Sequence, residues 1–77
     1  MKQTKERSYS VLIKYNKTEF EEIAHYFNYE KALDRFQTML VFFKMPHSLA
    51  YSPKQQKEFM FWDHEIGVGL QLKINNQ

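Results

Sequence analysis

One amphipathic segment near the middle of the chain constrains the fold more than any other feature of the sequence. In NYEKALDRFQTMLVFFKM, residues 28–45, apolar side chains recur at helical spacing: Leu33, Phe36, Leu40 and Phe43. Asn28 is a preferred N-cap residue, and Pro46 disfavours helical backbone at the residue before it, so we predict a helix over 29–45. Because a single helix can cover only one face of a sheet, the other segments must supply the layer against which it packs.

Segments with strand-like alternation lie on both sides of this helix. In SYSVLIKYN, every second residue from position 9 to position 15 is β-branched or aromatic, and Leu12 is the apolar residue out of step. From position 68 to position 74, apolar residues alternate with glycine, glutamine and lysine. We predict a strand over each segment, with one apolar face directed toward the helix.

The segment 18–27 fits either a helix or a strand. As a helix, it begins with a capping box formed by Thr18 and Glu21, and its apolar residues fall on one face. As a strand, it follows the preceding strand through a two-residue hairpin turn at Asn16 and Lys17. We favour the strand because the preceding strand requires a neighbour.

The chain after the main helix also has two interpretations. Residues 46–57 form a connection, in which a short helical turn is expected from Pro53. A helix over 53–66 has cap signals at both ends, whereas FMFW is rich in β-forming residues and gives the last strand a neighbour. We favour a second hairpin over 58–75, with a turn near 63–67.

These elements add up to one small domain of the α+β class. The polar residues 1–7 are expected to be flexible, and they are followed by a hairpin over 8–27, the helix over 29–45 and the second hairpin. The predicted sheet is four-stranded and mostly antiparallel, in the chain order ββαββ, with the helix packed on one face. A chain of 77 residues buries only about 60% of its unfolded surface, so additional burial in an assembly would stabilise it.

Composition narrows the classes of function. The chain has no cysteine, which excludes disulfides and thiolate ligands, and its net charge of +2 is too balanced for nucleic-acid binding held mainly by phosphate contacts. Neither a secretory signal nor an apolar run long enough to cross a bilayer is visible, so we expect a cytoplasmic protein without membrane partners. No motif predicts a cofactor or an activated nucleophile, so we expect a protein that is not an enzyme.

Asp63, His64 and Glu65 are the cluster of side chains best suited to ligate a metal or move protons. Along a strand, Asp63 and Glu65 point one way and His64 the other, so the three converge only if the backbone turns sharply. The spacing also matches no metal motif such as H-E-x-x-H. We interpret the triplet as a solvated hairpin tip and expect no metal site there.

Aromatic residues make up 17% of the chain, more than so small a core can bury, and exposed rings are typical of interfaces. Both faces of the FMFW segment are apolar, and the helix can cover only one of them. A host protein or a second copy in a homodimer can cover the other. We predict partner contacts at the following residues, with the two glutamates setting the polarity: Tyr26, Phe42, Tyr51, Phe61, Trp62, Glu21 and Glu22.

Nucleic-acid binding is the alternative function. Basic residues near the N-terminus lead into a strand that carries two tyrosines, and aromatic side chains on an open sheet can stack on bases. The residues that would carry this function are Lys2, Lys5, Arg7, Tyr9 and Tyr15. The string of basic, glycine and aromatic residues that marks sheet-based RNA binders is missing, so this function ranks second.

The order of these elements resembles a loose group of small ββαββ proteins that are common in phages and other mobile elements. The resemblance rests on a first hairpin, then FNYEKALDRFQTML, then a hairpin that carries FWDHE and a following glycine. It covers nearly the whole chain, but it is a likeness of architecture and transfers no functional residue. Members of this group often bind and block a host protein, sometimes a defence system, which implies a non-enzymatic inhibitor inside a host cell.

Overall fold

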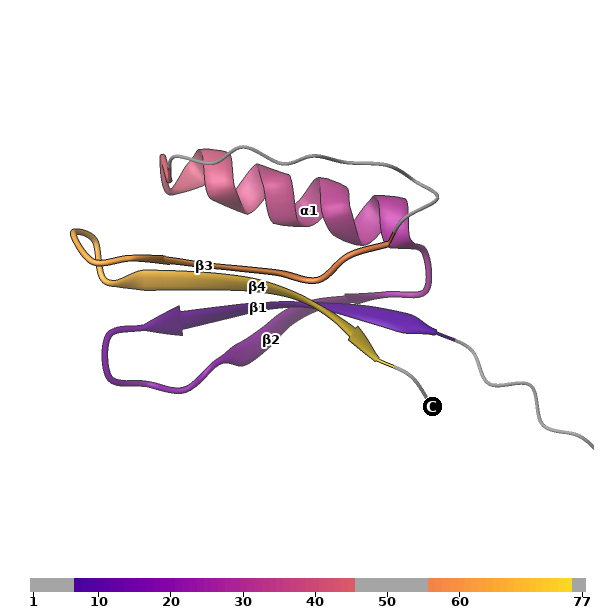
Figure 1. Ribbon diagram of the computed structural model, residues 1–77, viewed down its shortest axis with the longest axis horizontal. Coiled ribbons are helices and arrows are strands. Elements are labelled where there is room, and N and C mark those ends of the chain that lie inside the picture. The colour runs from indigo at the N-terminus through magenta and orange to yellow at the C-terminus, as the bar shows by residue number, and fades with distance from the viewer. Residues whose placement is uncertain (1–6, 46–55, 76–77) are drawn as a thin grey trace, which may run out of the picture.

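Four strands and one helix make up the fold in the computed structural model, which describes residues 7–45 and 56–75. The elements follow one another along the chain as β1 (Ser8–Tyr15), β2 (Glu21–Tyr26), α1 (Tyr29–Phe42), β3 (Phe59–Asp63) and β4 (Val68–Asn75). The strands pair antiparallel in the order β2-β1-β4-β3, and α1 lies on one face of the sheet (Figure 1). The predicted α+β class and ββαββ order are confirmed. The predictions for residues 1–6 and 46–55, including the helical turn at Pro53, lie outside the described residues.

The first hairpin has a longer loop than the predicted two-residue turn. Asn16, with a φ of 38°, and Lys17 are the central residues of a β-turn, which the Thr18 N–H closes by donating to the Tyr15 carbonyl at 2.7 Å. The Thr18 hydroxyl also donates to that carbonyl at 2.7 Å and accepts from the Tyr15 N–H at 3.0 Å. Thr18 therefore occupies the N–H and the carbonyl of Tyr15, which a paired strand would otherwise use, and β2 begins only at Glu21.

The helix ends at Phe42, three residues before the predicted end, because a Schellman motif stops it. Lys44 takes the left-handed conformation with a φ of 55°, and its N–H donates to the Val41 carbonyl at 3.0 Å. The Met45 N–H donates to the Leu40 carbonyl at 3.0 Å, and the Met45 side chain is buried. Met45, the last residue of the predicted helix, therefore belongs to the cap that follows the helix.

Asn28 caps the start of the helix as predicted, because its Oδ1 accepts from the Lys31 N–H at 3.0 Å. In the first turn, the Tyr29 hydroxyl donates to the Lys57 carbonyl at 2.9 Å and accepts from the Lys57 N–H at 3.0 Å. These bonds tie the beginning of α1 to the residues that lead into β3.

The core lies between α1 and the sheet face that α1 covers. Its buried residues are Tyr9, Val11, Ile13, Tyr29, Ala32, Leu33, Phe36, Leu40, Met45, Val68, Leu70 and Leu72. The Phe36 ring stacks against Phe59 and Phe61, with centroid distances of 6.0 Å and 5.9 Å. Among the described residues, Cα atoms of α1 lie within 8 Å of those of β1, β2 and β4 but not of β3, so these aromatic rings join β3 to the helix layer.

Candidate partner-binding surface

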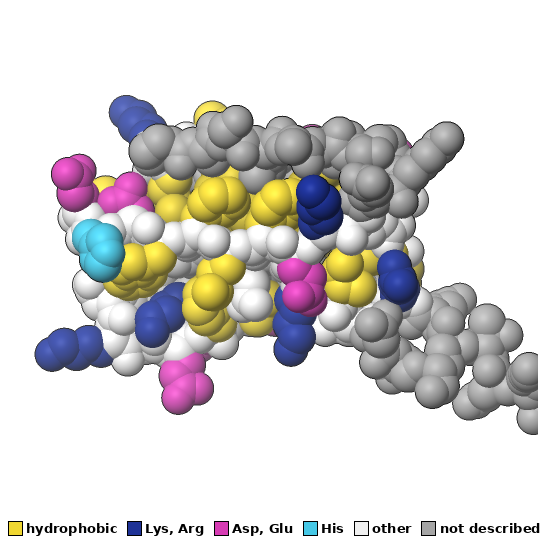
Figure 2. Space-filling view, viewed as in Figure 1, with side chains coloured by type: hydrophobic (Ala, Val, Ile, Leu, Met, Phe, Trp, Pro, Cys, Tyr) yellow, Lys and Arg dark blue, Asp and Glu magenta, His cyan; other side chains and the backbone are white. Residues whose placement is uncertain are grey.

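The sheet face opposite α1, called here the open face, carries the side chains that alternate with the core residues. Strand register fixes its two central rows: Met60, Gln71 and Leu12 lie side by side, and so do Trp62, Gly69 and Lys14. None of the described helices or strands covers this face (Figure 1). In Figure 2, hydrophobic side chains lie both above and below the band of white atoms that follows β3, and Lys or Arg side chains lie among the lower ones.

Trp62 is held in a fixed position on the open face while much of its ring stays accessible. A Cβ atom at Gly69 would lie 2.9 Å from Trp62 Cε3 and 3.3 Å from Phe20 Cζ, so the missing side chain of Gly69 makes room for both rings. Lys14 Nζ lies 5.7 Å from the indole centroid, and the indole N–H donates to His64 Nδ1 at 3.1 Å. Trp62 nevertheless remains 40% exposed.

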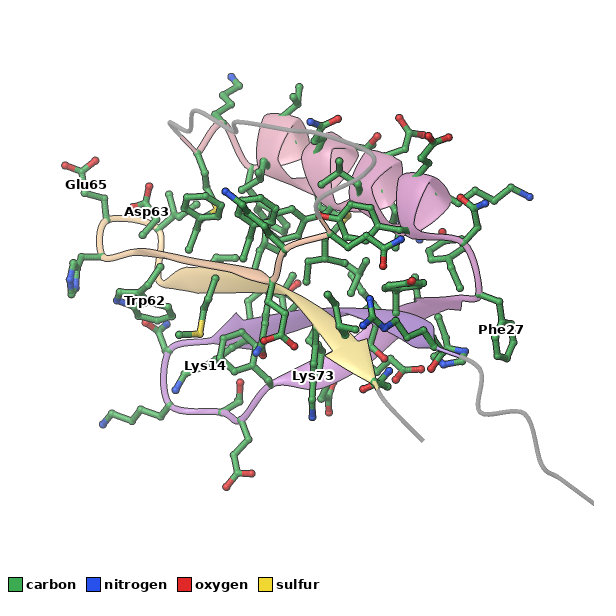
Figure 3. All side chains as sticks on the ribbon, turned by 45° about the vertical axis from the view of Figure 1, so that its right-hand side comes forward. Lys14, Phe27, Trp62, Asp63, Glu65 and Lys73 are labelled. Atoms are coloured by element: carbon green, nitrogen blue, oxygen red, sulfur yellow. The ribbon has the colours of Figure 1, made fainter. Side chains whose placement is uncertain are left out.

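The rest of the apolar surface extends from Trp62 along β3 and toward β1. Met60 is 64% exposed beside Trp62, and Leu12, the residue out of step in the sequence pattern, is half-buried in the same row. Figure 3 shows Trp62, Lys14 and Lys73 on the side of the sheet away from α1. The surface therefore combines an aromatic and aliphatic centre with two lysines at its margin.

The opposite end of the open face is polar and internally hydrogen-bonded. Asn75 Nδ2 donates to Ser8 Oγ at 3.3 Å and to Ser10 Oγ at 2.8 Å, while the Ser10 hydroxyl donates to Glu22 Oε1 at 2.8 Å. Both serine side chains are buried, and these bonds satisfy them. This network strengthens the β2-β1-β4 part of the sheet and leaves the exposed apolar area to the half that carries Trp62.

The Asp63-His64-Glu65 triplet lies at a hairpin tip, and the predicted turn near 63–67 is confirmed. Asp63 Oδ1 accepts from the N–H groups of Glu65, at 2.8 Å, and Ile66, at 3.2 Å, which shapes the turn. His64 accepts from Trp62, and the Glu65 side chain points away from Asp63 (Figure 3). Across residues 7–45 and 56–75, no group of three or more His, Cys, Asp or Glu is placed to hold a metal ion.

The structure does not bring the seven predicted partner residues together on one surface. Trp62 and Glu22 lie on the open face, toward opposite edges of the sheet, and Phe42 is 73% exposed on α1. Phe61 and Tyr26 are half-buried against the core, and Glu21 is exposed opposite Ile13 on β1. Tyr51 lies outside the described residues.

The residues of the nucleic-acid alternative are also dispersed. Tyr9 is only 4% exposed, because its ring packs edge-on against Tyr29 and its hydroxyl donates to Gln56 Oε1 at 2.7 Å. It therefore cannot stack on a base. Tyr15 is half exposed at the end of β1, and Arg7 donates to Gln56 at 3.1 Å. Lys2 and Lys5 lie outside the described residues.

Sequence reasoning missed Met60, Lys14, Lys73 and Leu12 as members of the surface. Two signals could have found the apolar members: Leu12 breaks the alternation of its strand, and FMFW is apolar at all four positions. Their meeting on one face, however, depends on how β1, β4 and β3 are aligned, which the sequence does not state.

Comparison with known proteins supplies no relative from which a function could be inferred: no family model, curated protein or solved structure matches this chain. No helix in the described part of the chain is long and apolar enough to cross a membrane.

Proposed function

We propose that this protein is a non-enzymatic binding protein whose open face contacts a partner protein. The observation that carries this proposal is Trp62, which is anchored by Gly69, Lys14 and His64 and yet remains 40% exposed. A tryptophan held in one position loses little side-chain entropy on binding, and tryptophans are enriched among the residues that dominate interface energies.

The composition of the surface around Trp62 indicates the kind of partner. Met60 and Leu12 add apolar area, and methionine adapts to partners of irregular shape. Lys14 and Lys73 place positive charges at the margin, and the Glu58 carboxylate, which accepts from the Ile74 N–H, lies beside Lys73. A complementary partner surface would therefore combine an apolar centre with a carboxylate that faces Lys14. The architectural resemblance to phage proteins supports the further proposal that binding blocks a host protein inside the cell.

Capture from a lysate of the host, with three immobilised forms of the protein, tests this proposal. We expect the wild-type protein and Phe42→Ala to retain equal amounts of the same partner. Trp62→Ala should retain at least about tenfold less of it, as for an interface hot spot. Phe42→Ala is the matched control because it removes an aromatic ring that is 73% exposed on the other layer. The unfolding free energy of each variant is measured in parallel to show that it is folded.

Two outcomes would contradict the proposal. In the first, every captured protein binds Trp62→Ala as well as it binds the wild type, which would assign binding to another surface. In the second, the retained material disappears after nuclease treatment, and the pure protein shifts labelled single-stranded DNA or RNA at low salt. This second result would favour the nucleic-acid alternative.

A further inference from the structure

The two outer strands of the sheet differ in how well they resist pairing with another strand. β2 carries Glu21, Glu22 and His25, and its pairing with β1 shifts register between Val11 and Leu12, which is the mark of a β-bulge. Charges and bulges are devices by which natural sheets prevent contact between edges. The β2 edge is therefore protected.

The β3 edge has none of these devices over residues 59–62. This stretch, FMFW, contains neither charge nor proline, and its pairing with β4 runs without a register shift. Within the described part of the chain, no backbone hydrogen bond reaches β3 from outside the β3–β4 hairpin. The backbone of α1 also lies closer to β1, β2 and β4 than to β3, which contacts the helix through the rings of Phe59 and Phe61.

We propose that β3 pairs antiparallel with β3 of a second copy of the chain, so that one sheet continues across both. For a five-residue strand, full overlap places the two-fold axis at Phe61. Met60 then lies opposite Trp62 of the second copy, and Phe59 lies opposite Asp63 of the second copy. The axis is perpendicular to the sheet, so both helices lie on the same side.

Self-pairing fits this strand because the two contacting edges are apolar and complement each other. Met60, 64% exposed in one copy, meets the 40% exposed Trp62 of the other on the open face, where a thioether and an indole interact favourably. No like charges oppose each other across residues 59–62. The dimer also joins two open faces into one surface.

This inference goes beyond the proposed function, because it concerns the isolated protein and holds whether or not the open face binds a host protein.

Sedimentation equilibrium of the pure protein over a range of concentrations tests the proposal. We expect a reversible dimer for the wild type, and for Met60→Lys a dissociation constant raised at least about tenfold, because the Met60–Trp62 contact is lost and a lysine on an edge strand opposes pairing. Val41→Lys is the matched control, since Val41 is 66% exposed on α1, and its dimer should be unchanged. Both positions are exposed, so at protein concentrations low enough for all three proteins to be monomeric, both variants should unfold at wild-type denaturant concentrations.

A wild-type protein that stays monomeric up to about 1 mM, the weak end of specific association, would overturn the proposal. A dimer that Val41→Lys disrupts and Met60→Lys does not would overturn it as well, because the helix would then be the interface.

Engineered cysteines test the register, since the natural chain has none. Opposite residues in an antiparallel pair have Cα atoms about 4.5–5.5 Å apart, within the range that a disulfide spans. We expect a mixture of Met60→Cys and Trp62→Cys proteins to form disulfide-linked dimers under mild oxidation. Either protein alone should cross-link far less, because two copies of residue 60 would lie diagonally, about 7–8 Å apart. Equal cross-linking of the mixture and of the single variants would exclude this register.

Discussion

Replacing Phe36 with alanine is expected to lower the free energy of unfolding by about 3–5 kcal/mol, the usual cost of removing a large buried ring. Phe36 is fully buried at the centre of the core, and its ring stacks on both Phe59 and Phe61. The loss also releases β3 from the helix layer, because the backbones of α1 and β3 do not approach each other closely and the aromatic rings provide the contact between them. Because small domains are stable by only about 0.05–0.15 kcal/mol per residue, this loss is a large fraction of the total stability and should shift the unfolding midpoint to a much lower urea concentration.

Phe42→Ala is the matched control for this change, because it is the same substitution on the same helix. Phe42 is 73% exposed, so its loss should alter the unfolding free energy by no more than about 0.5 kcal/mol. Urea unfolding followed by circular dichroism measures both variants. Similar losses for the two variants would mean that the helix packs in a different rotation from the one described.

Gly67→Ala should cost about 2–3 kcal/mol, although the glycine lies in a hairpin turn. Gly67 has a φ of 67°, which costs other L-residues roughly 1–2 kcal/mol. A Cβ atom there would also overlap Asn16 Oδ1 and approach Asn16 Cγ to 2.9 Å. The two loops are packed together at this point, because the Asn16 N–H donates to the Gly67 carbonyl at 2.9 Å.

Measuring Gly67→Ala in a second protein, Asn16→Gly, separates the cost of the backbone conformation at residue 67 from the cost of the overlap with the Asn16 side chain. In an Asn16→Gly chain the overlapping side chain is absent, so Gly67→Ala should cost only the backbone term of about 1–2 kcal/mol. Chemical denaturation of the four proteins in this double-mutant cycle gives the coupling between the loops. If Gly67→Ala costs the same in both backgrounds, the loops are not packed as described.

The architecture could be predicted because its signals are local. The capped amphipathic helix and the two alternating strands each follow from a few neighbouring residues, and the need of each strand for a neighbour decided the ambiguous segments. The exact ends could not be predicted. Lys44 takes a left-handed conformation that lysine rarely adopts, and Thr18 uses its hydroxyl where a ladder bond was expected. Neither choice leaves a pattern in the sequence.

The candidate surface could be predicted only in part. One helix covers one face, so an apolar FMFW strand had to expose part of its side chains, and Trp62 and Met60 are indeed exposed. Which rings lie on which face depends on strand register and on the position of the helix over the sheet, and these are tertiary properties. Tyr9 and Phe61 therefore turn toward the core, whereas Lys14, distant in sequence from Trp62, lies over its ring.

Lysine modification of the captured complex tests the central claim, that the open face is the binding surface, most directly. The measurement compares the rates at which an amine-reactive reagent labels each lysine in the free protein and in the complex. We expect Lys14 and Lys73, on the open face, to become protected, while Lys31 and Lys44, at the two ends of α1, react as before. Protection of Lys31 and Lys44 with unchanged labelling of Lys14 and Lys73 would contradict it.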